Sequence, residues 1–287
     1  MSRGAIWANL LLISALWGAS FPLVRFVVAE MSPLAMTAAR GFIAAAALTL
    51  FLYATRAEAG GFRGVWRHAL VLGAMNGLVP NILNGMALQR IESLPGALVQ
   101  ATTPIFIAIL AALVLREDRL TLPRLAGVGL GFLGVAIIMG PAALQGGATL
   151  SGVLLMLGVA ACYAVATCYM RWARPAASAS LVICQQIAYA VPATGLTLAL
   201  LGPSGFAASG AVWLVLGVLA ILASAVPLTL FVRTLRFATA GQASIVGYLQ
   251  PVAAALAGAV LLGEVPEPRI LAGGLVVLLG CWLMTRD

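Results

Sequence analysis

Ten long runs of apolar residues follow one another along the chain, separated by short segments that are polar or rich in glycine and proline. A helix of about 20 residues crosses the hydrocarbon core of a bilayer, which is about 30 Å thick, and each run is close to that length. The runs cover residues 6–28, 33–55, 68–89, 94–115, 121–140, 150–171, 178–201, 211–235, 239–262 and 268–285. The pattern therefore predicts an all-α polytopic membrane protein with ten transmembrane helices.

The fourth run recurs in the ninth run, 147 positions later. Pro104 falls on Pro251 and Glu117 falls on Glu264. Beyond the following loop the offset is 146, and five further positions match: Leu125, Ala126, Gly127, Leu133 and Gly134 with Leu271, Ala272, Gly273, Leu279 and Gly280. Such an internal repeat predicts two related units, which we place at residues 1–145 and 146–287. The two glutamates are expected to mark the ends of their helices.

Each unit contains five predicted spans, so the second unit must enter the membrane from the side opposite to the first. The earlier spans take part in the repeat as well, at an offset of 146: Ala15 with Ala161, Arg25 with Arg171, and Ser32 with Ser178. Inverted repeats of this kind are typical of secondary transporters, whose solute site lies near the midplane between the two units. The expected fold is therefore two inverted five-helix repeats around a central cavity.

The composition agrees with a membrane protein and excludes several kinds of chemistry. Charged residues make up 8% of the chain, whereas about a quarter of the residues of a soluble domain are charged. All sixteen basic residues are arginines, so there is no lysine for a phosphate-binding P-loop or for a Schiff base. The single histidine, His68, is expected in a loop, and the four cysteines form no CxxC pair. We predict no catalytic residue, no metal and no cofactor.

The arginines are distributed unevenly between the two sides of the predicted membrane domain. Twelve lie on the side of the termini, three lie on the other side, and Arg40 lies inside the second run. Since cytoplasmic loops carry an excess of basic residues, we expect a multi-pass protein of the inner (plasma) membrane with both termini in the cytoplasm. The arginine excess then reflects topology, and no nucleic-acid partner is expected. The sequence leaves the oligomeric state open and is compatible with a monomer.

Four prolines near the middle of their runs form two pairs related by the repeat: Pro80 with Pro227, and Pro104 with Pro251. A proline lacks an N–H and disrupts the hydrogen bond to the carbonyl four residues earlier. In a membrane, that carbonyl must be buried in protein or face a wet cavity. A packing kink is the plainer explanation for one proline, but four at matching positions indicate hinges or cavity-lining positions.

Uncharged polar and aromatic side chains gather around these prolines. Asn76, Pro80 and Asn84 are spaced four residues apart and are expected on one face of a helix. The candidates for substrate binding are Trp17, Asn76, Asn84, Gln100, Tyr163, Ser244, Tyr248 and Gln250. Amides, hydroxyls and aromatic rings at the midplane suit a neutral or zwitterionic solute. The alternative is hydrogen bonding between helices, worth about 0.6 kcal/mol on average in membrane proteins.

Arg40 is a further substrate-binding candidate, and its repeat partner is Gln186. A charge at the bilayer centre costs at least about 2.5–3.5 kcal/mol on insertion scales. Arg40 therefore either faces the cavity, where it would meet a substrate carboxylate, or extends toward the interface. No aspartate or glutamate lies deep in a run, and proton relays in membranes commonly use such groups. We thus expect facilitated diffusion or exchange without obligatory proton coupling.

Several features together resemble the drug/metabolite transporter superfamily, and within it the ten-helix EamA-type branch of amino-acid and metabolite exporters. They are the two five-span units, the WGASF run at 17–21, the proline-centred spans ending in Glu117 and Glu264, and the glycine-rich fifth and tenth spans. The resemblance covers the whole chain. It implies a cavity lined by spans 1, 3, 4, 6, 8 and 9, with spans 5 and 10 peripheral, and alternating access through helices bent near the midplane.

Export of aromatic amino acids is one activity of that branch, but the pocket expected here is less aromatic than such a specificity would require. We therefore predict export of amino acids with broad specificity, and of similar small metabolites. The fold equally allows transport of a sugar, nucleoside, vitamin or drug. An intramembrane enzyme would need a nucleophile or metal constellation, and an ion channel would show rings of charge or carbonyl filters. The sequence shows neither pattern.

Overall fold

The computed structural model describes residues 3–56, 58, 60–115, 122–140, 148–175, 178–234, 237 and 240–285. Helices fill almost all of these residues, and the described part of the chain contains no strand. The first half consists of α1 (Arg3–Val27), α2 (Pro33–Thr55), α3 (Val65–Gly73), α4 (Val79–Leu88), α5 (Ser93–Gln100), α6 (Thr103–Leu110) and α7 (Leu122–Met139). The second half consists of α8 (Ala148–Ala173), α9 (Ala179–Leu201), a 3-10 turn (Pro203–Phe206), α10 (Gly210–Ala220), α11 (Val226–Thr234), α12 (Ala240–Leu262) and α13 (Pro268–Thr285).

The helices correspond in order to the ten predicted spans, and the predicted all-helical membrane fold is confirmed. Three spans are each built from two helices in line: α3 with α4, α5 with α6, and α10 with α11. Seven helical segments of the described chain are long and apolar enough to cross a membrane. Helices α7, α12 and α13 contribute the shorter apolar stretches Leu125–Ile138, Leu249–Leu262 and Pro268–Leu283.

The loop predicted around His68 was wrong. This residue lies in the first turn of α3, and its Nδ1 atom is 2.9 Å from the hydroxyl of Tyr169 on α8. The helix begins at Val65, three residues before His68, and the hydrogen bond gives the imidazole a partner within the bundle.

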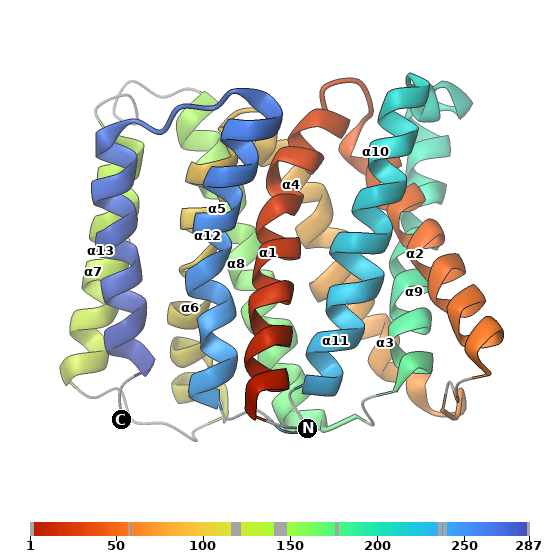
Figure 1. The fold of residues 1–287 in the computed structure, drawn as a ribbon, viewed down its shortest axis with the longest axis horizontal. Helices are drawn as coiled ribbons and strands as arrows, with labels where there is room; N and C mark the ends of the chain where they lie inside the picture. The colour runs from red at the N-terminus through yellow and green to blue at the C-terminus, as the bar shows by residue number, and fades with distance from the viewer. Residues whose placement is uncertain are drawn as a thin grey trace.

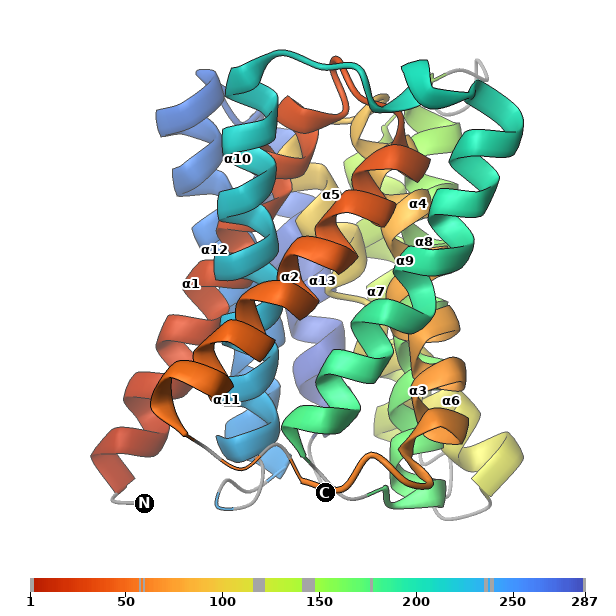
Figure 2. The same ribbon diagram turned by 90° about the vertical axis from the view of Figure 1, so that its right-hand side faces the viewer.

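The two halves run through the bundle in opposite senses (Figure 1, Figure 2). Helix α1 starts at the end of the bundle where α13 finishes, whereas α8, the repeat partner of α1, starts at the opposite end. Repeat partners also meet each other: α2 packs against α9, and α7 packs against α13. The packing of α1 on α12 is reproduced by the packing of α8 on α5 and α6. These reciprocal contacts are those of two inverted five-helix repeats.

Equivalent serines begin α2 and α9. The Ser32 hydroxyl accepts a hydrogen bond from the backbone N–H of Ala35 at 3.1 Å, and the Ser178 hydroxyl accepts one from Leu181 at 3.3 Å. A side-chain cap of this kind satisfies one of the unpaired N–H groups of the first turn and contributes about 1 kcal/mol. The repeated serine in the sequence thus reflects the same structural need in both halves.

Two π-helical turns occupy repeat-related positions in the third and eighth spans. They cover Ala74–Leu78 and Ile221–Ala225 and lie immediately before the turns that contain Pro80 and Pro227. In each, the N–H that precedes the proline donates to a carbonyl five residues earlier. The wider turn adjusts the backbone just before a residue that can donate no N–H of its own. Both prolines therefore sit beside real irregularities of their helices.

The other proline pair is not symmetrical. The fourth span is interrupted at Ala101 and Thr102, and Pro104 lies in the first turn of α6. Its partner Pro251 lies inside α12, which runs without interruption from Ala240 to Leu262. The expected matching bends at Pro104 and Pro251 are thus found as a break in the first half and a continuous helix in the second. The two halves share topology but not local conformation here.

Helices α7 and α13 pack closely through glycines. A Cβ atom added to Gly134 would lie 2.6 Å from the backbone nitrogen of Val277 and 2.7 Å from the carbonyl oxygen of Gly273. One added to Gly280, the repeat partner of Gly134, would lie 2.6 Å from the carbonyl oxygen of Gly127. Small residues let membrane helices approach this closely. The glycines of the fifth and tenth spans therefore serve close packing between these two helices.

Candidate solute-binding cavity

A cavity of about 320 Å³ lies between the two halves, among the middle parts of the helices. Its polar lining residues are Ser20, Arg40, Asn76, Asn81, Asn84, Gln100, Thr103, Thr167, Gln185, Gln186, Ser224 and Gln250. Its aromatic lining residues are Trp17, Phe21, Tyr163, Tyr189 and Phe231. The volume is at the small end of the range of about 300–1,000 Å³ for ligand pockets, which suits a solute smaller than a drug.

Most of the candidate residues lie on this cavity. Seven substrate-binding candidates line it: Trp17, Arg40, Asn76, Asn84, Gln100, Tyr163 and Gln250. The side chains of Ser244 and Tyr248 lie outside the described residues. Of the hinge candidates, Pro104 lines the cavity, and Pro80, Pro227 and Pro251 are not among its lining residues. The lining is an observation, and the role of these residues in binding stays a prediction.

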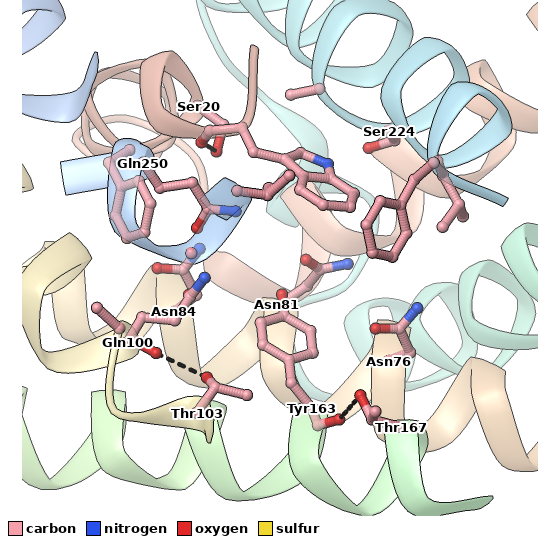
Figure 3. A pocket seen from close by; sticks show the side chains of 18 of the residues that line it. Ser20, Asn76, Asn81, Asn84, Gln100, Thr103, Tyr163, Thr167, Ser224 and Gln250 are labelled. Carbon is pink, nitrogen blue, oxygen red and sulfur yellow. Dashed lines mark hydrogen bonds between the residues drawn. The ribbon is translucent and has the colours of Figure 1, made fainter. Parts of the chain in front are cut away.

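The asparagines of the third span show why simple helical spacing was insufficient. Asn76, Pro80 and Asn84 were expected on one face, but the three side chains that line the cavity are Asn76, Asn81 and Asn84. The π turn adds one residue between the first two, because its hydrogen bonds span five residues rather than four. Asn81 therefore takes the place expected for Pro80. Figure 3 shows Asn81 and Asn84 from α4 beside Gln250 from α12.

Two spans that the family resemblance does not name as lining the cavity also line it. The family resemblance implied spans 1, 3, 4, 6, 8 and 9, but span 2 contributes Arg40, and span 7 contributes Gln185, Gln186 and Tyr189. The contact between α2 and α9 brings these residues to the middle of the bundle. The available signal was the repeat itself, since Gln186 is the partner of Arg40 and a polar residue at both positions marks an inward face.

The structure places Arg40 in the interior and not at the interface. Its side chain is buried, and its Nε donates to the hydroxyl of Ser224 at 2.7 Å. The terminal nitrogens donate over longer distances, 3.3 Å to Oδ1 of Asn81 and 3.4 Å to the carbonyl oxygen of Ala223. Ala223 and Ser224 belong to the π turn of the eighth span. Arg40 is the one charged side chain among the described residues that line the cavity.

Asn84 carries an acceptor without a partner. Its side chain is buried, and its Oδ1 forms no hydrogen bond within the described part of the chain. An unpaired buried polar atom costs about 1–3 kcal/mol, so such an atom calls for an explanation. Because Asn84 lines the cavity, its carboxamide is positioned to bind a polar group of a solute.

Aromatic rings form another part of the lining. Trp17 of α1 and Phe231 of α11 meet edge to face, with ring centroids 5.2 Å apart. Tyr163 of α8 also lines the cavity, and its backbone carbonyl accepts a hydrogen bond from the hydroxyl of Thr167 at 2.8 Å (Figure 3). Aromatic faces hold apolar groups and also attract ammonium groups. Together with the carboxamides, they provide an environment for a small amphipathic solute.

An ion pair and hydrogen bonds join α1, α5 and the end of α12 at the end of the bundle away from the termini. Glu264 follows Gly263, whose φ of +68° ends α12, and its N–H donates back to the carbonyl oxygen of Gly258 at 3.2 Å. The Glu264 side chain is buried. It forms an ion pair with Arg25 of α1 and accepts hydrogen bonds from the N–H of Ser93 at 3.1 Å and its hydroxyl at 2.8 Å. Glu264 thus does more than mark a helix end, while Glu117 lies outside the described residues.

Comparisons with known proteins agree with this architecture. An "Uncharacterized transporter" of Archaeoglobus fulgidus is 29% identical over 138 residues, which are 47% of this chain and 48% of that protein. The "Uncharacterized transporter YyaM" of Bacillus subtilis is 29% identical over 135 residues, which are 47% of this chain and 44% of that protein. The chain therefore spans about half the length of these curated relatives in each match.

A solved structure, described only as "Crystal structure of protein", shares the fold. The two superpose with a TM-score of 0.68 at 20% sequence identity, over 99% of this chain and 97% of the other. The sequence model of the EamA-like transporter family matches residues 2–140 and 150–286. These two segments include nearly the whole chain. The chain belongs to the EamA-like transporter family.

Proposed function

We propose that this protein is a secondary transporter that exports amino acids, with broad specificity, and similar small metabolites by alternating access. The observation that carries the proposal is the cavity between the two inverted halves, lined by carboxamides, hydroxyls, aromatic rings and one arginine. Such a lining offers partners for a carboxylate, an ammonium group and a variable apolar side chain. Both termini lie in the cytoplasm under this proposal, as the arginine distribution predicts.

The helices around the cavity support alternating access. Inverted repeats allow one half to move against the other around a fixed central site. Three of the four paired prolines lie beside a π turn or a helix break, where a helix can bend with little loss of hydrogen bonding. The hinge role of Pro80, Pro104, Pro227 and Pro251 stays a prediction, as does a boundary between the repeat units at residues 145 and 146.

The charges of the cavity support facilitated diffusion or exchange. No described residue that lines the cavity is an aspartate, a glutamate or a histidine. A proton relay within the membrane usually needs one of these side chains. The protein is therefore expected to equilibrate or exchange its solutes without obligatory proton coupling.

Counterflow into proteoliposomes tests this function. Vesicles that contain the purified protein and an unlabelled amino acid should take up the same labelled amino acid faster than empty vesicles, and faster than vesicles loaded with a sugar or a nucleoside. An imposed pH gradient alone should produce no accumulation. Accumulation driven only by that gradient would refute exchange without proton coupling. Counterflow of sugars or nucleosides in place of amino acids would refute the proposed solute class.

A further inference from the structure

We infer that Arg40 is the receptor for a carboxylate on the transported solute, and that this carboxylate takes the place of Asn81 and of the Ala223 carbonyl on the arginine. The inference rests on the proposed function and adds to it the group that a solute must carry. It connects solute recognition to the π turn before Pro227, because Ala223 belongs to that turn.

The charge of Arg40 is not compensated within the described residues. Its three hydrogen-bond acceptors, from Ser224, Asn81 and Ala223, are all neutral, and no described carboxylate forms an ion pair with it. Buried charges in proteins are normally paired, and an arginine inside a membrane domain marks a site of function by default. A solute anion supplies the missing charge.

The geometry indicates where that anion binds. The Nε–H bond to Ser224 is short, at 2.7 Å, whereas the bonds from the two terminal nitrogens measure 3.3 Å and 3.4 Å. Ordinary N–H···O bonds cluster near 2.9–3.0 Å, so the terminal nitrogens are weakly held. These are the atoms with which arginine binds a carboxylate through two parallel hydrogen bonds. Ser224 keeps the guanidinium oriented through Nε. The two terminal nitrogens can exchange their present acceptors for the two oxygens of a carboxylate.

The repeat restricts the site to one per molecule. The position equivalent to Arg40 is Gln186, whose Oε1 accepts a hydrogen bond from the Tyr189 hydroxyl. This second position is neutral and is already bonded inside its own helix. Among the described residues the cavity therefore offers one cation, for one carboxylate, and we infer that the solute is a monocarboxylate and not a dicarboxylate.

The remaining lining suits the other parts of an amino acid. The unpaired Oδ1 of Asn84 is an acceptor for an ammonium group, and the rings of Trp17 and Phe231 are partners for an ammonium or an apolar side chain. No lining carboxylate among the described residues competes for Arg40. A cationic amine that lacks a carboxylate would place a second positive charge near Arg40 with no negative charge to balance it. The inference therefore excludes such amines as solutes.

A series of four compounds tests the inference on the wild-type protein. Leucine, 4-methylpentanoate, leucinamide and 3-methylbutylamine share one apolar group and differ in their carboxylate and amino group. The first two should raise the unfolding temperature of the purified protein in detergent and compete in leucine counterflow, and the last two should do neither. Equal effects of leucinamide or 3-methylbutylamine would overturn the inference, whatever happens to any variant.

The variant Arg40→Gln gives this position the residue found in the other repeat. Loss of a charge-assisted hydrogen-bonded pair should weaken leucine binding by about tenfold to hundredfold and remove the discrimination between leucine and leucinamide. Arg90→Gln is the matched control, since Arg90 is exposed and its side chain donates, within the described residues, to the carbonyl of Met86. Unchanged leucine affinity in a folded Arg40→Gln protein would contradict the assignment.

The carboxylate site at Arg40 and the transport of amino acids can be refuted separately. If 4-methylpentanoate and leucine stabilise the wild-type protein but leucine shows no counterflow, the carboxylate site stands and amino-acid transport is wrong. If leucine shows counterflow but leucinamide competes equally well, amino-acid transport stands and the role of Arg40 is wrong. If none of the four compounds binds or competes, both are wrong.

Discussion

Replacement of Gly134 by leucine should lower the unfolding temperature of the purified protein more than replacement of any exposed glycine of the same helix. The Cβ alone would lie 2.6 Å from the backbone nitrogen of Val277 and 2.7 Å from the carbonyl oxygen of Gly273. Backbone atoms cannot rotate away as side-chain atoms do, so α7 and α13 must separate. Overpacking typically costs about 1–3 kcal/mol and occasionally more, and we expect the upper end of this range.

Gly129 provides the control on the same helix. A Cβ at Gly129 would meet nothing within 4 Å, so Gly129→Leu should leave the unfolding temperature almost unchanged. Both substitutions add the same side chain to α7, and differences in helix propensity therefore cancel. Similar unfolding temperatures for the two variants, measured by thermal scanning in detergent, would show that the glycine contacts between α7 and α13 do not hold these helices together.

Replacement of Glu264 by alanine should destabilise the end of the bundle that lies away from the termini. The carboxylate holds Arg25 of α1 and both the N–H and the hydroxyl of Ser93 at the start of α5. Removal of one partner from a buried ion pair typically costs 3–5 kcal/mol. Because the Arg25 side chain is 34% exposed and remains partly hydrated, we expect a loss of about 3 kcal/mol, near the low end of that range.

Glu267→Ala is the control for this prediction. Glu267 lies in the same connection and pairs with Arg269 at 2.9 Å, but its side chain is 63% exposed. Exposed pairs contribute about 0–1 kcal/mol, so this variant should unfold almost like the wild type. The double variant Arg25→Leu with Glu264→Leu should recover part of the stability, since no unpaired charge remains. Equal effects of Glu264→Ala and Glu267→Ala would show that the buried pair does not stabilise this end.

The arrangement of the helices could be predicted from the sequence because it depends on two robust signals. Apolar runs of about 20 residues define spans without knowledge of their neighbours, and the offsets of 146 and 147 relate the halves directly. With five spans in each unit, inversion follows from counting. These arguments need no side-chain contact, and the resulting fold agrees with the structure.

The details of the cavity depend on tertiary contacts and were only partly predictable. Asn81 entered the cavity because a π turn shifts the register before Pro80, and a spacing argument based on regular helices cannot anticipate that turn. Glu264 looked like an ordinary helix end, since the sequence does not show that Arg25 and Ser93 lie beside it. The position of Arg40 stayed undecided for a similar reason, because its acceptors come from two other spans and lie 41 to 184 residues away in the sequence.

The most direct test of the central claim, that the cavity between the two halves carries the solute, is leucine counterflow by an Asn84→Leu variant. Asn84 lines the cavity, and its Oδ1 has no hydrogen-bond partner within the described residues. The substitution removes no hydrogen bond of Oδ1, because this atom has no partner in the described part of the chain. A leucine side chain is also similar in size to asparagine and should fit the same position. With Gly129→Leu as a folded control, we predict that Asn84→Leu unfolds at or above the wild-type temperature and loses most counterflow. Counterflow at the wild-type rate would contradict the claim.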